Sequence, residues 1–310
     1  MQLRHVKRIG LFGLITLLAG CGGGDSQPDV LQEEVVRIPV ADIRFDDVNF
    51  SNCVFDGSNA NAIYVDDIKE ISCNDKGIDD ITGLEQLTHL ETVRLSRNNI
   101  SDISAIGLTP SIKTLFISSN AGISNIGPLQ SLKNINNLFM SGNNVSDLSS
   151  LGTLSTLKVL EIYNLESASD LSPIGDLNEL TILKITGAVN VADFSALESL
   201  TNLFTLSISN SGSVNVPSLD VLPDLRRLSF VGNNMTDVSQ LSSLTNLLFL
   251  DLSYSNVTTG VSSLSALLNV NEILLVGNQT TMPCVDLVTL QSAIPEIVTP
   301  TGSASGIDCL

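Results

Sequence analysis

The stretch "LETVRLSRNNISDIS", residues 90–104, decides the fold because its pattern returns along the chain. It reappears as "INNLFMSGNNVSDLS" at 135–149 and as "LRRLSFVGNNMTDVS" at 225–239. One frame, L-x-x-L-x-L-x-x-N-x-I, aligns ten such units at spacings of 22 or 23 residues. The asparagine of the frame is present in five units, as Asn98, Asn120, Asn143, Asn233 and Asn278. The chain is therefore expected to be an array of one repeated structural unit.

The other five units fill the asparagine position with a different residue: Lys76, Leu165, Ala188, Ser211 and Ser255. Leu165, Ala188 and Ser211 belong to three consecutive units, so the row of asparagines is interrupted in the middle of the array. The sequence leaves two alternatives open here, an irregular bend of the coil or a substituted packing of the same coil.

The repeated pattern has a direct physical meaning. In segment 92–96, polar residues alternate with the apolar Val93 and Leu95, as in a short strand with one buried face. Ile100, Ile103 and Ile106 then recur at three-residue intervals, which a tight helical or extended turn would require. Such a unit has too little core to fold alone, so neighbouring units must stack and align their strands in parallel. We expect the asparagine to point inward and to bond backbone groups at the bend.

These motifs carry a resemblance to a known family. Residues 68–283 resemble a leucine-rich repeat domain of the 22-residue kind found in bacterial internalin-like proteins, through "SDIS", "SDLS" and "TDVS" after the asparagine and "LSSLTNL" at 241–247. The resemblance implies an α/β solenoid: a leucine-rich repeat horseshoe of about ten repeats with short parallel strands on its concave side. It extends to an N-terminal cap at 41–67 and a C-terminal cap at 284–310.

The two caps bear on four of the five cysteines, which in an exported chain favour disulfides. Four cysteines allow three pairings, with buried free thiols as the alternative. The resemblance places one pair of cysteines in each cap, and ten stacked strands would separate the caps by roughly 40–45 Å. We therefore expect Cys53–Cys73 and Cys284–Cys309, which would close both ends of the solenoid.

The N-terminus reads as a targeting segment. Residues 1–20 hold three basic residues and then the apolar stretch 9–18, which fits a secretory signal peptide. The string "LAGC" at 18–21 resembles the lipobox of bacterial lipoproteins, which implies that Cys21 carries acyl chains such as palmitate and anchors the protein to a membrane. Gly22 favours the outer membrane, and residues 21–40 would be a flexible lipidated tether. The alternative is an ordinary signal peptide with a chance cysteine.

Charge narrows the range of partners. The chain has 15 Lys and Arg against 33 Asp and Glu, a net charge of −18. Without residues 1–20, 12 basic residues remain against the same 33 acidic ones, which gives about −21. Such a chain would be repelled by nucleic acid and by anionic lipid headgroups. It fits a basic partner or, more simply, a soluble surface that resists aggregation.

Residues for catalysis are scarce. His89 is the one histidine beyond the targeting segment and is expected in a turn or on the surface. The sequence has neither a zinc-spaced His/Cys cluster nor a phosphate-binding glycine loop. Asp102, Asp147 and Asp237 recur in phase with the repeat and so mark turns, and the acidic stretch 74–80 lacks the order of a calcium loop. We predict no enzyme activity, no cofactor and no metal site.

What remains is the outward face of the strands. Phe116 and Phe139 stand in adjacent units, Tyr163 follows in the next, and Arg94 and Arg97 lie one unit away. Solvent-facing aromatic residues on a rigid sheet are typical anchors for a protein partner. The alternative is that the phenylalanines merely cover each other as a cross-strand stack. The outward position at the centre of each unit is filled, in order, by Ser72, Arg94, Phe116, Phe139, Glu161, Lys184, Ser207, Ser229, Asp251 and Leu274.

Together these features predict an envelope-anchored leucine-rich repeat lipoprotein. It would act as a non-catalytic module that binds an unknown protein ligand through its concave face. The alternative function is a passive structural or glycan-associated protein of the cell envelope. Retention of polysaccharide but of no protein in a pull-down would favour that alternative.

Overall fold

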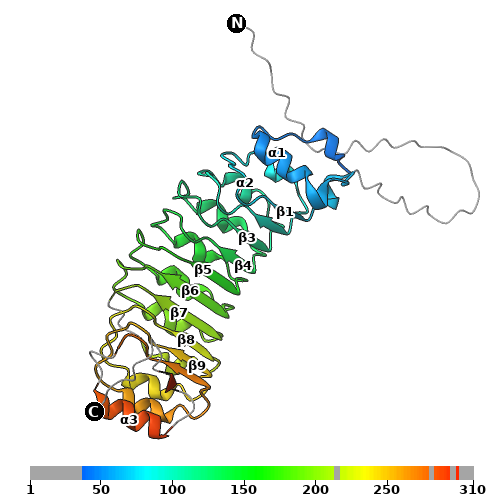
Figure 1. Cartoon of the computed structure of the whole chain (residues 1–310). Helices are drawn as coiled ribbons and strands as arrows, with labels where there is room; N and C mark the ends of the chain where they lie inside the picture. Colours follow the sequence, from blue (N-terminus) through cyan, green and yellow to red (C-terminus); the bar gives the residue numbers. More distant parts are fainter. Residues whose placement is uncertain (1–36, 213–216, 279–282, 294–297, 300–310) are drawn as a thin grey trace, which may run out of the picture. The chain divides into compact units, whose positions relative to one another are not determined.

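A computed structural model describes residues 37–212, 217–278, 283–293 and 298–299. Within these residues, eleven strands form one parallel sheet whose order follows the sequence from β1 to β11. In Figure 1 the strands lie along one side of the coil and the short helices along the other. The strands are β1 Glu70–Ser72, β2 Thr92–Arg94, β3 Thr114–Phe116, β4 Asn137–Phe139, β5 Val159–Ile162, β6 Ile182–Thr186, β7 Thr205–Ser209, β8 Arg227–Ser229, β9 Phe249–Asp251, β10 Glu272–Leu274 and β11 Val298–Thr299.

Short helices return the chain from one strand to the next. Most are single 3-10 turns: η1 Val40–Asp42, η2 Gly57–Asn59, η3 Val65–Asp67, η4 Leu84–Gln86, η5 Gly127–Ser131, η6 Ser149–Thr153, η7 Ser172–Asp176, η8 Ser195–Ser199, η9 Leu219–Val221, η10 Ser239–Ser243 and η11 Val261–Ala266. The α-helices of the described residues are α1 Val48–Phe55, α2 Ser104–Gly107 and α3 Cys284–Ala293. The three-residue spacing of apolar side chains fits these 3-10 turns, which place residues i and i+3 on one face.

The strand register confirms the predicted inward and outward positions. Val93 pairs with Leu115, and Leu115 pairs with Leu138, so equivalent residues of the repeat lie side by side. The second residue of each strand from β1 to β10 is buried: Ile71, Val93, Leu115, Leu138, Leu160, Leu183, Leu206, Leu228, Leu250 and Ile273. The predicted leucine-rich repeat solenoid, with ten repeat strands followed by β11, is therefore confirmed. We call the opposite side of the strands the outer sheet face.

The asparagines of the repeat point inward, as expected. Asn120 is fully buried, and its amide nitrogen donates to the carbonyls of Leu95 and Ile117, both at 3.0 Å. Its side-chain oxygen accepts from the backbone N–H of Ile100 at 3.2 Å. One side chain thus satisfies three backbone groups that the sharp turn leaves without strand partners.

The interruption of the asparagine row is a substituted packing. Leu165 and Ala188 are buried in place of the amide, and the hydroxyl of Ser211 donates to the carbonyl of Ser209 at 3.1 Å. In these units the strands run longer, to four residues in β5 and five in β6 and β7. The backbone N–H of Leu165 bonds the carbonyl of Thr186 at 2.9 Å, so main-chain pairing replaces part of the amide's role.

The recurrent "SDIS" motif and its variants start the helical side of most coils. In each case the aspartate accepts a hydrogen bond from the backbone N–H two residues later, for example Asp147 from Ser149 at 2.9 Å. Asn125 makes the same bond to Gly127 at 2.8 Å, so an amide can replace the carboxylate. The other aspartates in this role are Asp80, Asp102, Asp170, Asp193 and Asp237.

The N-terminal cap covers the first repeat, and the disulfide Cys53–Cys73 joins them. Asp47 caps α1 by accepting from the N–H groups of Asn49 and Phe50, and it also accepts from Asp79 and Asp80 in the first coil. Burial opposes ionisation of Asp47, but these four backbone bonds outweigh burial and lower its pKa.

The cap also begins earlier than the sequence suggested. Residues 37–40 were expected in the tether, yet Ile38 and Val40 bond the backbone of Val65 and Ile63, both at 2.9 Å. Arg37 forms an ion pair with Asp66 at 2.8 Å. These contacts place residues 37–40 in the cap rather than in the tether.

At the other end, α3 and β11 follow the last repeat, and β11 pairs with β10. The side chain of Cys284 and the whole of Cys309 lie outside the described residues, so the second disulfide stays a prediction. Cys21 and the targeting segment also lie outside them. Among the described residues, the structure contains no helix with the length and apolar character needed to cross a membrane.

Candidate binding face

The outer sheet face brings together four of the five predicted contact residues. Phe116 and Phe139 stack with ring centroids 4.3 Å apart and ring planes 2° from parallel. The guanidinium of Arg94 lies 5.1 Å from the ring centre of Phe116. Tyr163 extends the same surface by one coil, and its hydroxyl donates to the Glu161 carboxylate at 3.1 Å. Arg94, Phe116, Phe139 and Tyr163 are called the aromatic row below.

The aromatic row is less open than the sequence suggested. Phe116, Phe139 and Tyr163 are half-buried rather than fully solvent-facing, because neighbouring side chains cover them. The 4.3 Å stacking distance is close to the roughly 4.8 Å spacing of strands. The rings therefore stack across the strands and present their edges, not their faces, to solvent. The stack predicted as the structural alternative is thus present, and it leaves a narrow apolar ridge.

Charged groups hold both ends of this ridge. Arg94 forms an ion pair with Glu70, and Lys184 pairs with Glu161 at 2.7 Å. Burial and the nearby Glu161 carboxylate raise the pKa of Tyr163 to about 12. The Tyr163 hydroxyl therefore stays protonated near neutral pH and remains a hydrogen-bond donor.

Arg97 lies apart from the other four residues. It occupies the turn after β2 with a φ of 58°, in the left-handed region that non-glycine residues seldom adopt. Its guanidinium is exposed and approaches Asp75 of the preceding coil at 3.9 Å. The structure thus groups Arg94 with the phenylalanines and places Arg97 with the turns.

A second feature of the outer sheet face was missed at the sequence level. A hollow of about 250 Å³ lies over β6 to β9, and the ring of Phe249 carries the Arg227 guanidinium 4.4 Å from its centre. The frame that placed Phe116 also places Arg227 and Phe249 on adjacent strands in register. Arg227 and Phe249 fill the first outward position of their units, one strand apart.

The outer sheet face is nearly neutral although the chain is strongly acidic. Within β1 to β10 the charged residues are three cations (Arg94, Lys184 and Arg227) and four carboxylates (Glu70, Glu161, Asp251 and Glu272). Three minus four gives −1, against −18 for the whole chain. The acidic surplus therefore lies elsewhere, and this face escapes most of the repulsion that would discourage association.

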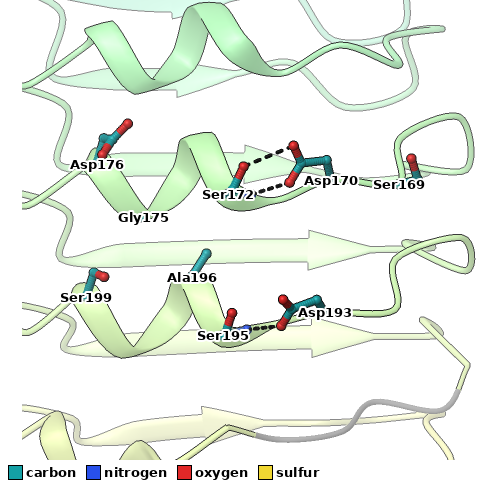
Figure 2. Close-up of a pocket in the computed structure, with 9 residues that line it drawn as sticks. All are labelled: Ser169, Asp170, Ser172, Gly175, Asp176, Asp193, Ser195, Ala196 and Ser199. Carbon is teal, nitrogen blue, oxygen red and sulfur yellow. Dashed lines mark hydrogen bonds between the residues drawn. The ribbon is translucent and has the colours of Figure 1, made fainter.

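An acidic hollow of about 280 Å³ lies on the helical side, between η7 and η8. Figure 2 shows that two of its three aspartates are engaged locally, with Asp170 bonded to Ser172 and Asp193 to Ser195. The bond from the Ser195 N–H is the main cause that lowers the pKa of Asp193. We assign this hollow to the turn structure of the repeat.

His89 is exposed in a turn, as expected, with its ring nitrogen 3.1 Å from the Thr88 hydroxyl. No group of three or more His, Cys, Asp or Glu side chains among the described residues is placed to hold a metal ion.

Comparison with solved structures supports the fold. Internalin InlF from Listeria monocytogenes superposes with a TM-score of 0.59 at 21% sequence identity, over 86% of this chain and 92% of that one. The chain has an internalin-like leucine-rich repeat fold. Internalin C2 from the same organism gives a TM-score of 0.54 at 26% identity, over 77% of this chain and 97% of that one. No protein-family model and no curated protein matches the chain.

Proposed function

We propose that the chain is a non-catalytic protein-binding module that is anchored to the bacterial envelope and contacts its ligand with the outer sheet face. The observation that carries the proposal is the aromatic row, an apolar ridge bordered by ion pairs on a nearly neutral face. Aromatic and arginine side chains at the centre of a contact surface supply most of the affinity in many protein interfaces. Similarity to the internalins supports the scaffold and not the identity of the ligand.

Preorganisation strengthens the proposal. The ring stack and the Glu161–Tyr163–Lys184 contacts already fix the side chains that a partner would meet. A partner would therefore lose little side-chain entropy of this protein on binding. The narrow ridge favours a partner with a complementary groove over one with a flat surface.

The test is affinity capture from solubilised envelopes of cells that produce the protein. We expect the Phe116→Ala/Phe139→Ala double variant to recover at least about tenfold less of a specific protein than the wild type, as for a hot spot of about 1.4 kcal/mol or more. Leu108→Ala is the matched control, because Leu108 is an exposed apolar residue at the end of α2, on the helical side. Equal recovery by the folded double variant would contradict the proposal, and recovery of polysaccharide alone would support the passive envelope alternative.

The anchor is a separate part of the proposal and rests on the "LAGC" string at 18–21. We infer that Cys21 is acylated and that the protein resides in the outer membrane by this lipid. Replacing Cys21 with Ser should abolish labelling by a fatty-acid probe and release the protein from the membrane fraction. Labelling that persists in the Cys21→Ser variant would refute the lipid anchor without affecting the binding proposal.

A further inference from the structure

The hollow over β6 to β9 has the composition of a binding site for an anionic group. Its charged walls are Lys184 and Arg227, its aromatic wall is Phe249, and hydroxyls of Thr205, Ser207 and Ser229 also line it. These residues lie on the outer sheet face, beyond the coil that carries Tyr163. The hollow is thus a neighbour of the aromatic row and not a part of it.

Arg227 is the cation of the hollow without an ion-pair partner among the described residues. Of the three cations on β1 to β10, Arg94 pairs with Glu70 and Lys184 with Glu161. Arg227 is exposed and has no carboxylate partner within 4.0 Å among the described residues. Its guanidinium is held on the Phe249 ring at 4.4 Å. A planar guanidinium that is oriented in this way offers a fork of N–H donors to a carboxylate.

The hydroxyls add further donors. In the described part of the chain, the side chains of Thr205, Ser207 and Ser229 make no hydrogen bond to another residue, in contrast to Ser118 and Ser141, whose hydroxyls accept from the next coil. Hydroxyl groups without a protein partner are free to donate to an anion that displaces water from the hollow.

Two exposed apolar residues directly precede two residues that line the hollow, Thr205 and Phe249. Phe204 and Leu248, which immediately precede β7 and β9, expose 46% and 38% of their surface. Arg226 lies between them, because its N–H bonds the Phe204 carbonyl at 3.0 Å and its carbonyl accepts from Leu248 at 2.8 Å. Apolar side chains of a ligand that cover Phe204 and Leu248 would shield a nearby charge contact from water.

From this arrangement we propose that the hollow binds the side-chain carboxylate of one Asp or Glu in an extended segment of the protein ligand. Arg227 would hold the carboxylate with two N–H groups, and Phe204 and Leu248 would receive apolar residues beside it. The inference rests on the proposed protein-binding function and adds the chemistry of the ligand to it.

The charge of the chain limits the ligand further. Asp251 and Glu272 lie on β9 and β10, at the far side of the hollow, and the whole chain carries −18. A segment with several acidic residues would be repelled by these groups. The ligand segment should therefore carry a single acidic residue among neutral or basic ones.

The experiment uses a phage-displayed library of random twelve-residue peptides, selected on the wild-type protein and on the Arg227→Gln variant. Arg97→Gln is the matched control, because Arg97 is an exposed arginine in the turn after β2, apart from both the hollow and the aromatic row. We expect peptides selected on the wild type and on the control to share one Asp or Glu at a fixed position. Selection on Arg227→Gln should lose that residue.

Affinity measurements on one selected peptide then isolate the contact. Replacing its acidic residue with the matching amide should weaken binding to the wild type by about tenfold or more and to Arg227→Gln by less than about twofold. Equal losses on both proteins, or selected peptides without a fixed acidic residue, would overturn the inference.

The outcome separates this inference from the proposed function. Peptides that depend on Phe116 and Phe139 but carry no fixed acid would retain the proposed function and refute the carboxylate site. Peptides that depend on Arg227 but not on the phenylalanines would retain the carboxylate site and refute the aromatic row. A library that yields no binder on the wild type counts against both.

Discussion

At the scale of single residues, the buried asparagines show how one side chain closes a turn. Asn120 is fully buried and bonds three backbone groups inside the coil. We expect Asn120→Ala to lower the free energy of unfolding by at least about 2 kcal/mol, since buried polar groups without partners cost about 1–3 kcal/mol each. The measurement is urea unfolding followed by circular dichroism.

An exposed asparagine in the preceding coil supplies a control for this prediction. Asn99 is exposed, so Asn99→Ala should change the free energy of unfolding by about 0.5 kcal/mol or less. An equally small effect of Asn120→Ala would mean that the coil replaces the amide as easily as it does in the units of Leu165 and Ala188.

Two adjacent residues of β4 test the register of the whole sheet. Leu138 is fully buried, so Leu138→Ala should cost about 2–5 kcal/mol. Phe139 is half-buried and loses mainly its stacking with Phe116, so Phe139→Ala should cost about 0.5–1.5 kcal/mol. Thermal unfolding of both variants gives the comparison. The reverse order would show that the inner and outer faces had been exchanged.

At the scale of elements, the aspartates that start the short helices make the coil sensitive to acid. Bonds from Ser104 lower the pKa of Asp102, and bonds from Ser149, Ser195 and Ser239 do the same for the aspartates two residues before them. A lowered folded-state pKa contributes stability that is present above the unfolded-state pKa of about 3.9 and is lost as pH falls through the folded-state pKa. The melting temperature should therefore fall steeply below about pH 4.

The natural amide at Asn125 shows how to test the cause of that acid sensitivity. Asp147→Asn and Asp237→Asn keep an oxygen that can accept the turn's hydrogen bond, as Asn125 does. Combining both substitutions should leave folding at pH 7 intact and reduce the fall in melting temperature between pH 7 and pH 3. An unchanged fall would assign the acid sensitivity to other carboxylates, such as Asp47.

The sequence predicted the strands and the inward asparagines because the same spacing of apolar residues recurs about every 22 residues, and each coil must bury these residues in the same way. It did not predict the longer strands β5 to β7. Where the asparagine amide is missing, the added strand pairing depends on backbone carbonyl groups of the neighbouring coil, such as that of Thr186. For the candidate site, alternation placed Phe116 and Phe139 on one face but did not reveal how far each ring covers the other. The sequence did not single out Arg227, because the orientation of its guanidinium depends on a contact with Phe249 in the next coil.

At the scale of the whole array, each coil touches mainly its two neighbours, so stability is close to a sum of local terms. The first coil has a neighbour on one side alone and depends on the N-terminal cap for the other. Four features fix that cap: the disulfide Cys53–Cys73, the four backbone bonds to Asp47, the pairing of residues 37–40 with 63–65 and the Arg37 ion pairs. Loss of the cap should therefore destabilise β1 and β2 before the other strands.

Replacing Cys53 and Cys73 together with Ser tests this view of the array. The disulfide closes a loop with a sequence separation of 20 residues, so its loss should cost about 3 kcal/mol by the loop-entropy argument. Hydrogen exchange read by mass spectrometry should show faster exchange in the cap, β1 and β2, with β5 to β8 protected as in the wild type, because coils that far away share no contacts with the cap. Faster exchange spread evenly over all coils would show instead that the array unfolds as one cooperative unit.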